Sequence, residues 1–234
     1  MKNKILFLMV LVLITAFSGC KKVTTDGFTQ ITYYPTLEVL GDPVVITPLG
    51  LTYVDPGAKA LLQGEDVTSE IVTTSNVNTS VGGVYSVLYK ITNKDGYSRT
   101  ASRTVYVADT TPSVISTGIH TVAAGTNRVV ISTGVTVNYS GYPVLLLQTA
   151  PGVFYISDFF GGYYDKRAGY GSNYAMTGYF KVNADYTLSL ISSHIIGWGD
   201  SLDELNNASV DPVTGKITFS AVYVGSYSFN VILN

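Results

Sequence analysis

Residues 83–107, GVYSVLYKITNKDGYSRTASRTVYV, carry the strongest structural signal in the chain. Apolar and polar side chains alternate through 83–92, and a period of two is typical of a β-strand with one buried face. The following NKDG, 93–96, is a turn sequence in which Gly96 accommodates a positive φ. Residues 98–107 then alternate again. The stretch therefore predicts an antiparallel β-hairpin with one face in a core.

The composition extends this prediction to the whole chain. Tyrosine accounts for 18 of the 234 residues, Thr, Val and Gly are abundant, and only four Glu are present. β-Branched and aromatic residues favour strands, and strong helix formers are scarce. Turn signals recur about every 8–12 residues, a spacing typical of sandwiches. We therefore expect an all-β protein.

The first 20 residues have the pattern of a targeting segment. Two lysines precede an apolar run, 5–17, that is shorter than the ~20 residues of a membrane span. Residues 17–20, FSGC, resemble the bacterial lipobox, with Phe where Leu is usual. The resemblance implies removal of a signal peptide, 1–19, and acyl chains on Cys20 that anchor the protein to the outer membrane, on a side left open. An uncleaved anchor helix is the alternative.

The remaining sequence divides into a tether and two domains. Residues 20–38 are polar at first and lack a period, which predicts a tether. Residues 39–109 form the first predicted domain, a polar junction follows, and 114–234 form the second, an antiparallel β-sandwich or open barrel. The expected strands are 44–46, 51–54, 67–72, 83–92 and 98–107 in the first domain, and 128–138, 143–148, 153–158, 174–183, 186–193, 216–224 and 226–233 in the second. One helical turn is expected at 201–207.

The first domain contains a series of spaced residues that resembles a known family. The series is Gly50, Tyr53, Asp55-Pro56-Gly57-Ala58, Asp66-Val67-Thr68, Gly83-Val84-Tyr85, Tyr89, Asp95-Gly96 and Val105-Tyr106-Val107. It resembles the Ig-like domain named after a pesticidal crystal protein and common in bacterial surface proteins. The resemblance implies a seven-stranded β-sandwich that serves as a spacer or adhesion module, without catalytic residues. Its aspartates are interpreted as turn and capping groups rather than calcium ligands. The second domain is similar, more loosely, to C-terminal domains of Bacteroidetes outer-membrane lipoproteins of unknown function, often linked to polysaccharide uptake.

Charge and motif content exclude several classes of function. Loss of the two signal lysines leaves 12 basic against 16 acidic residues and no basic block, so nucleic acid is not an expected partner. His120 and His194 lack the sequence context of a catalytic triad, and no metal-ligand spacing occurs. We expect no catalytic residue, metal or cofactor. Five acids, Asp158, Asp165, Asp200, Asp203 and Glu204, are the remaining route to a hydrolase.

Aromatic residues concentrate in one segment of the second domain. In 154–186, 11 of 33 residues are aromatic, against 12% in the whole chain, and glycines separate them. Phe154, Tyr179 and Phe180, on predicted strands, are expected in the core. The rings on glycine-rich loops are candidates for ligand binding: Tyr163, Tyr164, Tyr170 and Trp198. Packing of these rings within their own loops is the alternative.

These features predict a non-catalytic envelope lipoprotein that binds or helps to capture a glycan. Asp158, Asp165 and Asp200 would accept hydrogen bonds from sugar hydroxyls, and the low charge density favours a neutral polysaccharide. The expected partners are the membrane through the lipid, a polysaccharide, and outer-membrane proteins. A structural or adhesive module without a small ligand is the rival hypothesis, and an enzyme is the third.

Overall fold

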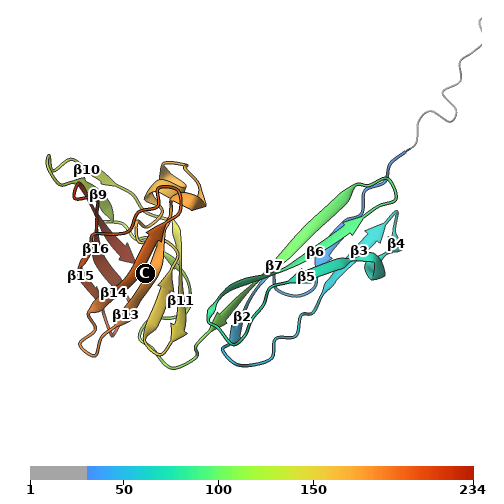
Figure 1. Ribbon diagram of the computed structural model, residues 1–234, viewed down its shortest axis with the longest axis horizontal. Coiled ribbons are helices and arrows are strands. Elements are labelled where there is room, and N and C mark those ends of the chain that lie inside the picture. The colour runs from blue at the N-terminus through green and yellow to red at the C-terminus, as the bar shows by residue number, and fades with distance from the viewer. Residues whose placement is uncertain (1–30) are drawn as a thin grey trace, which may run out of the picture. The chain divides into compact units, whose positions relative to one another are not determined.

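The computed structural model describes residues 31–234 (Figure 1). The predicted signal peptide, the lipidation site at Cys20 and most of the predicted tether lie outside the described residues. Within 31–234, no helix has both the length and the apolar character that crossing a membrane requires. Strands dominate both domains, so the all-β class predicted from composition is confirmed.

Residues 36–108 form a sandwich of two small sheets (Figure 1). One sheet has the order β1 (Thr36–Val39), β3 (Ala58–Leu62) and β4 (Glu65–Asp66). The other has the order β2 (Val44–Pro48), β7 (Ser98–Ala108), β6 (Gly83–Thr92) and β5 (Val72–Ser75), with a 3-10 turn, η1 (Thr68–Glu70), before β5. The β6–β7 hairpin is the one predicted from residues 83–107. Only β2 pairs in parallel among the strands of this domain, with β7.

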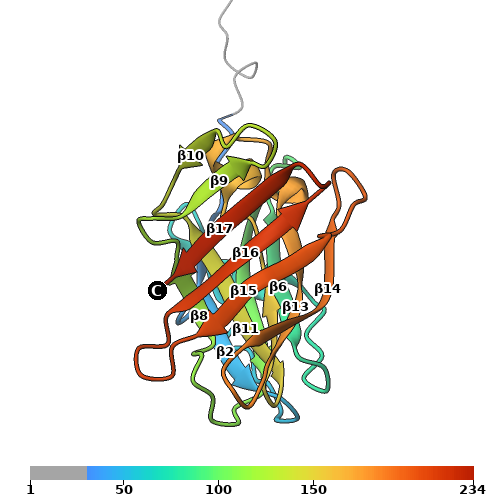
Figure 2. The same ribbon diagram turned by 90° about the vertical axis from the view of Figure 1, so that its left-hand side faces the viewer.

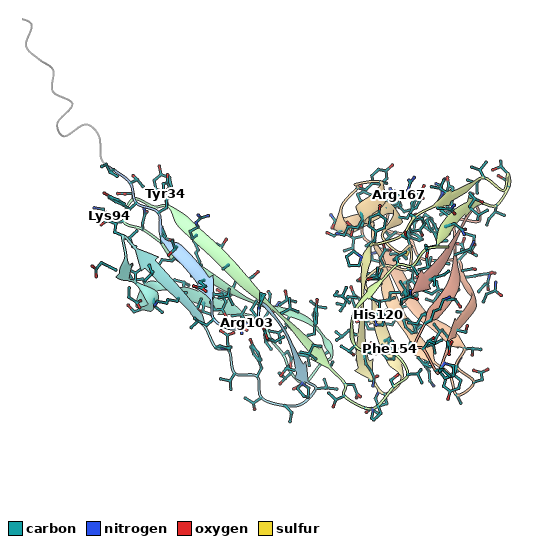
Figure 3. The ribbon with its side chains drawn as sticks, turned by 180° about the vertical axis from the view of Figure 1, so that it is seen from behind. Tyr34, Lys94, Arg103, His120, Phe154 and Arg167 are labelled. Carbon is teal, nitrogen blue, oxygen red and sulfur yellow. The ribbon has the colours of Figure 1, made fainter. Side chains whose placement is uncertain are left out.

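The core of this first domain contains a buried charge. Val87, Tyr89 and Ile91 alternate inward along β6, as the sequence period requires. Arg103 of β7 is fully buried (Figure 3), and its Nε lies 3.3 Å from the Asp55 carboxylate. That carboxylate also accepts hydrogen bonds from the hydroxyls of Tyr89 (2.6 Å) and Tyr53 (2.9 Å). Asp55 is therefore a structural group that neutralises a buried arginine.

Three predictions for this domain are wrong. Residues 51–54 form no strand, because Leu51 and Val54 are exposed and the chain turns there. Residues 67–72 contain the η1 turn instead of a strand, and the strand β5 begins only at Val72. The first sheet begins at Thr36, inside the tether predicted for 20–38, because β1 pairs with β3.

The second domain consists of two five-stranded antiparallel sheets that face each other. One sheet has the order β14 (Leu188–Ile195), β13 (Met176–Val182), β12 (Val153–Ile156), β11 (Pro143–Ala150) and β8 (Gly118–Thr121). The other, which faces the viewer in Figure 2, has the order β10 (Thr136–Asn138), β9 (Asn127–Val130), β17 (Tyr227–Leu233), β16 (Ile217–Tyr223) and β15 (Glu204–Val210). Two isolated bridges join the sheets: Thr187 to Ser209 beside β14, and Val122 to Leu233 just after β8. The domain is therefore a sandwich whose two sheets are linked at both edges of the β14–β8 sheet.

Aromatic rings fill the space between these sheets. Phe154 and Phe180 stack with centroids 5.6 Å apart, and Phe154 lies in the interior in Figure 3. Phe160 packs 4.2 Å from Phe229 of the opposite sheet. Such ring pairs add to the free energy gained from burying apolar area. The core continues to the end of the sandwich where β12 and β14 end, and the candidate site lies there.

The second domain also corrects several predictions. Residues 204–210 form strand β15 rather than a helical turn, because pairing with β16 overrides the local helix preference. The strand predicted for 128–138 is a hairpin, β9 and β10, and the short strand β8 was not anticipated. Tyr179 is 37% exposed, because neighbours in a strand point to opposite faces and Phe180 takes the inner one.

Candidate functional site

The segment between β12 and β13 is anchored by Asp158. This side chain is only 4% exposed. Its Oδ1 accepts hydrogen bonds from the backbone N–H groups of Phe160 (2.8 Å) and Met176 (2.9 Å), and its Oδ2 accepts one from Gly162 (2.8 Å). Burial raises the pKa of Asp158 to about 7, although these three donors oppose the shift. The prediction that Asp158 binds sugar hydroxyls is therefore wrong, because backbone donors already occupy its oxygens.

A tight turn follows the anchor and directs one tyrosine outward. Gly162 has φ +80°, and a Cβ there would lie 2.7 Å from Cβ of Tyr142. The next five residues, Tyr163–Arg167, form a single π-helical turn, η2. The turn is closed by the N–H groups of Lys166 and Arg167, which both donate to the carbonyl of Gly162. Consecutive tyrosines therefore point in different directions.

Tyr163 points into the core. It is 6% exposed, and its ring lies 5.2 Å from Tyr139 and 5.5 Å from Phe229. The prediction that Tyr163 belongs to an exposed binding surface is therefore wrong. Tyr164 is half-buried and makes an edge contact with Trp198 at 4.9 Å.

Trp198 lies in the turn that follows β14. The N–H of Gly199 donates to the carbonyl of Ile195, and the N–H of Gly197 donates to that of Asn173. A Cβ at Gly197 would lie 2.5 Å from Cε1 of Tyr174, so the backbone here is pressed against that ring. The indole of Trp198 is 41% exposed and meets Tyr174 edge-on at 4.9 Å. The turn thus holds a large ring at the surface on a firm support.

Residues from the opposite sheet complete the arrangement. Tyr223 of β16 and Tyr227 of β17 pair across the hairpin, and the Tyr223 ring stacks 6.1 Å from Trp198. Arg128 of β9 extends beside them, with its Cζ 5.0 Å from the centroid of Tyr227. Tyr170, which is 55% exposed, lies 5.9 Å from Tyr164.

Together these side chains surround an open pocket of about 490 Å³, which we call the aromatic pocket. It is lined by Arg128, Tyr164, Tyr170, Trp198, Tyr223 and Tyr227. A second hollow of about 330 Å³ adjoins it between Tyr170, Tyr174 and Trp198. Volumes of this order suit one or a few small rings. Flat apolar faces with polar tips can stack on a ligand ring and also bond its hydroxyls.

Two other predicted acids lie near the pocket but do not line it. Asp200 accepts a hydrogen bond from the Tyr223 hydroxyl at 2.7 Å. Burial and this bond raise the pKa of Tyr223. Asp165 forms an ion pair with Lys166 at 2.9 Å. Both aspartates therefore bind neighbouring side chains of the domain, one through a hydrogen bond and the other through an ion pair.

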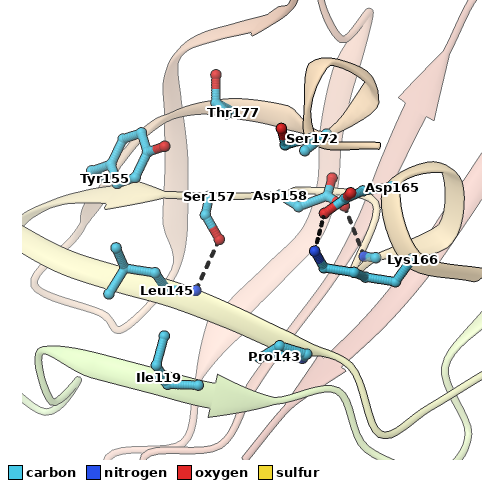
Figure 4. A pocket seen from close by; sticks show the side chains of 12 residues that line it. Ile119, Pro143, Leu145, Tyr155, Ser157, Asp158, Asp165, Lys166, Ser172 and Thr177 are labelled. Carbon is cyan, nitrogen blue, oxygen red and sulfur yellow. Dashed lines mark hydrogen bonds and ion pairs between the residues drawn. The ribbon is translucent and has the colours of Figure 1, made fainter. Parts of the chain in front are cut away.

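A separate cavity of about 300 Å³ lies between β8, β11 and the loop that Asp158 anchors (Figure 4). Asp158, Asp165 and Lys166 gather at one end of it, and Ser157 accepts a hydrogen bond from the N–H of Leu145. The other acids considered for catalysis are also engaged. Asp203 accepts a hydrogen bond from the N–H of Gly225, and Glu204 accepts one from the side-chain amide of Asn206. Each of the five acids therefore has a partner within the domain.

Sequence reasoning missed half of the aromatic pocket. Trp198, Tyr164 and Tyr170 come from glycine-rich loops and were predicted. Tyr223, Tyr227 and Arg128 come from distant strands, and only the sheet pairing brings them to the pocket. The sequence offered one signal for them: Tyr223 and Tyr227 stand at the two ends of the turn that joins the last two strands.

The fold defines a class of protein in which an Ig-like domain is followed by a β-sandwich domain. A family model described as a bacterial surface protein Ig-like domain matches residues 37–107, and one described as a C-terminal domain matches 109–234. The chain belongs to the family of the lipoprotein BT2262 from Bacteroides thetaiotaomicron. It is 42% identical to the crystal structure of that lipoprotein, which covers 86% of this chain and 100% of the other, with a TM-score of 0.74.

Other comparisons add little. A structure of CBM51-2 in complex with GlcNAc and INT domains from Clostridium perfringens ZmpB is 17% identical over 52% of this chain and 29% of the other, with a TM-score of 0.27. At that score the likeness carries no argument. No curated protein matches the chain. The similarity to a bacterial lipoprotein and to a surface-protein Ig-like domain is consistent with the cell envelope.

Proposed function

We propose that this lipoprotein binds a glycan in the aromatic pocket and catalyses no reaction. The observation that carries the proposal is the open pocket of about 490 Å³ beside the exposed rings of Trp198 and Tyr170. Sugar rings present apolar C–H faces and a rim of hydroxyls. Indole and phenol side chains offer the complementary surface, and a contiguous apolar patch is characteristic of a binding site.

The lining of the aromatic pocket, which contains no carboxylate, supports a binding role for it rather than hydrolysis. Glycoside hydrolysis needs two carboxyl groups facing each other across the scissile bond. In the part of the chain that the structure describes, Asp158 is held by backbone donors, and Asp165 and Asp200 by side chains. A ligand in the aromatic pocket would meet aromatic rings and one guanidinium.

Acylation of Cys20 would hold this pocket at the outer membrane, where a lipoprotein can pass captured polysaccharide to outer-membrane proteins. The lipobox resemblance and the family membership support this part of the proposal. The rival function is a structural or adhesive module. The burial of Tyr163 and the contacts among Tyr164, Tyr174 and Trp198 favour that rival, because rings can gather merely to pack a loop.

Replacing Trp198 by alanine distinguishes the two functions. We expect Trp198→Ala to lose most glycan binding on an array of immobilised oligosaccharides while the melting temperature falls only slightly, because 41% of the side chain is already exposed. A matched control is Tyr179→Ala, which removes an exposed ring from the outer face of β13 and should leave binding unchanged.

A large loss of stability in Trp198→Ala, of the ~3–5 kcal/mol that follows removal of a core ring, would favour the structural module. Unchanged binding in that variant would reject the aromatic pocket as the site.

A further inference from the structure

We propose that the aromatic pocket selects glycans that carry an anionic sugar, whose carboxylate or sulfate binds the guanidinium of Arg128. This inference rests on the proposed glycan-binding function and specifies its ligand class. It replaces the neutral polysaccharide expected from the sequence, because Arg128 lies far in sequence from the loops that suggested the site.

Arg128 is positioned by the sheet and by two rings. It pairs with Phe229 of β17, and its side chain lines the pocket. The Cζ atom lies 4.9 Å from the centroid of Tyr163 and 5.0 Å from that of Tyr227. The N–H donors of a guanidinium lie in its own plane, so contact with ring faces leaves them available to acceptors such as the Tyr164 phenol oxygen and a ligand. The buried Tyr163 thus supports the site from beneath.

No carboxylate neutralises this cation. Within residues 31–234 the ion pairs are Arg103 with Asp55 and Lys166 with Asp165, and neither involves Arg128. Its Nε is buried and has no hydrogen-bond acceptor among the described residues. A buried donor without an acceptor costs free energy, and a planar oxyanion is the partner that a guanidinium binds best, through two parallel hydrogen bonds.

The rest of the pocket lining carries no negative charge. The other five lining residues are tyrosines and the tryptophan, and the nearby Asp200 is already engaged by Tyr223. Tyr164 and Arg128 line the same pocket; burial raises the pKa of the Tyr164 phenol, and the positive charge of Arg128 opposes that rise. A sugar stacked on Trp198 or Tyr170 would therefore present its acidic group to one unopposed cation.

Matched ligands test this selectivity on the wild-type chain. The probes are a hexuronic-acid oligosaccharide with its methyl ester, and a sulfated galactan oligosaccharide with its desulfated form, both within an array that also carries neutral glycans. Each pair differs in charge and keeps the sugar stereochemistry. We expect every captured glycan to carry an acidic group and the charged member of a captured pair to bind about tenfold or more tightly. The pair that binds identifies carboxylate or sulfate as the recognised group.

Substitutions assign the selectivity to Arg128. Arg128→Gln should lose about tenfold or more in affinity for the charged member and leave any affinity for the neutral member unchanged. Arg128→Lys, which keeps the charge without the planar fork, should lie between. The control is Lys181→Gln, which removes an exposed positive charge from β13, outside the pocket.

The outcomes separate this inference from the proposed function. Capture of neutral glycans, equal to that of acidic ones and unaffected by Arg128→Gln, would overturn the inference and leave glycan binding intact. No capture of any glycan by the wild type would overturn both. The comparison within each ligand pair needs only the wild-type protein, so it decides the question even where Arg128→Gln does not fold.

Discussion

Asp158 shows how a single residue can serve the site without touching a ligand. Its carboxyl collects three backbone N–H groups from the loop and from the start of β13, so it fixes the turn from which Tyr164 and Tyr170 extend. Because the group is buried, its charged form is disfavoured and its pKa rises to about 7.

The raised pKa predicts an effect of pH on stability. The unfolded chain releases the Asp158 proton near its ordinary pKa of 3.8, and the folded chain only near 7. The stability from this group is therefore full below about pH 4 and is lost as pH rises toward 7, by up to ~1.4 kcal/mol per pH unit. The Asp158→Asn variant has no ionisable group at this position, so its free energy of unfolding should lack this pH dependence.

The measurement is urea unfolding followed by emission of Trp198, the only tryptophan in the chain. We expect the free energy of unfolding of the wild type, minus that of Asp158→Asn, to fall between about pH 4 and 7 and to level above it. A difference that stays constant or grows over that window would show that Asp158 is charged in the folded protein.

Individual site residues could be predicted only where local sequence places them. Trp198 and Tyr170 stand between glycines, which indicated exposed turns, and both are exposed. The same signal was wrong for Tyr163, because the tight turn buries this ring against Phe229 while the adjacent Tyr164 stays half-buried, and the sequence does not say which of the two is inward. Arg128 was missed because its role depends on pairing with a strand about 100 residues away.

At the scale of elements, the short turn η2 depends on the glycine before it. Gly162 has positive φ, and its Cα faces Tyr142 so closely that a methyl group would lie 2.7 Å from the Tyr142 Cβ. Gly169, at the other end of the same loop, also has positive φ but has open space around it. The two glycines form a matched pair.

We expect Gly162→Ala to destabilise the second domain more than Gly169→Ala. Both substitutions strain a left-handed backbone, at about 1–2 kcal/mol, and only the first adds a steric clash of about 1–3 kcal/mol. Gly162→Ala should also weaken glycan binding, because Tyr164 moves with the turn. Thermal unfolding of both variants measures the difference. Equal losses of stability would mean that the Tyr142 side chain moves aside without a cost in free energy.

Elements with a regular period were predicted well. Strands β6, β7, β16 and β17 lie close to their predicted positions, because each has one buried face and a strict alternation. Strand β15 has no such pattern: its bulge at Asn207, with φ 50°, interrupts the alternation, and its sequence favours a helical turn. Tertiary pairing decides its structure, and that information is not local.

At the scale of the whole molecule, only the second domain contributes residues to the aromatic pocket. The Ig-like domain contains a buried arginine, Arg103, paired with Asp55, and lines no part of the aromatic pocket. The second domain uses both of its sheets to build the pocket. In the proposed function, the first domain would serve as a spacer and the second as the binding unit.

The emission of Trp198 tests the central claim most directly, because the only tryptophan of the chain lies in the proposed site. The titrant is an oligosaccharide that the wild-type chain captures on the array. We predict a saturable change in the intensity or wavelength of this emission, with a midpoint that matches the affinity measured independently by calorimetry. Calorimetric binding without any change in the Trp198 emission would place the ligand elsewhere on the molecule and contradict the account.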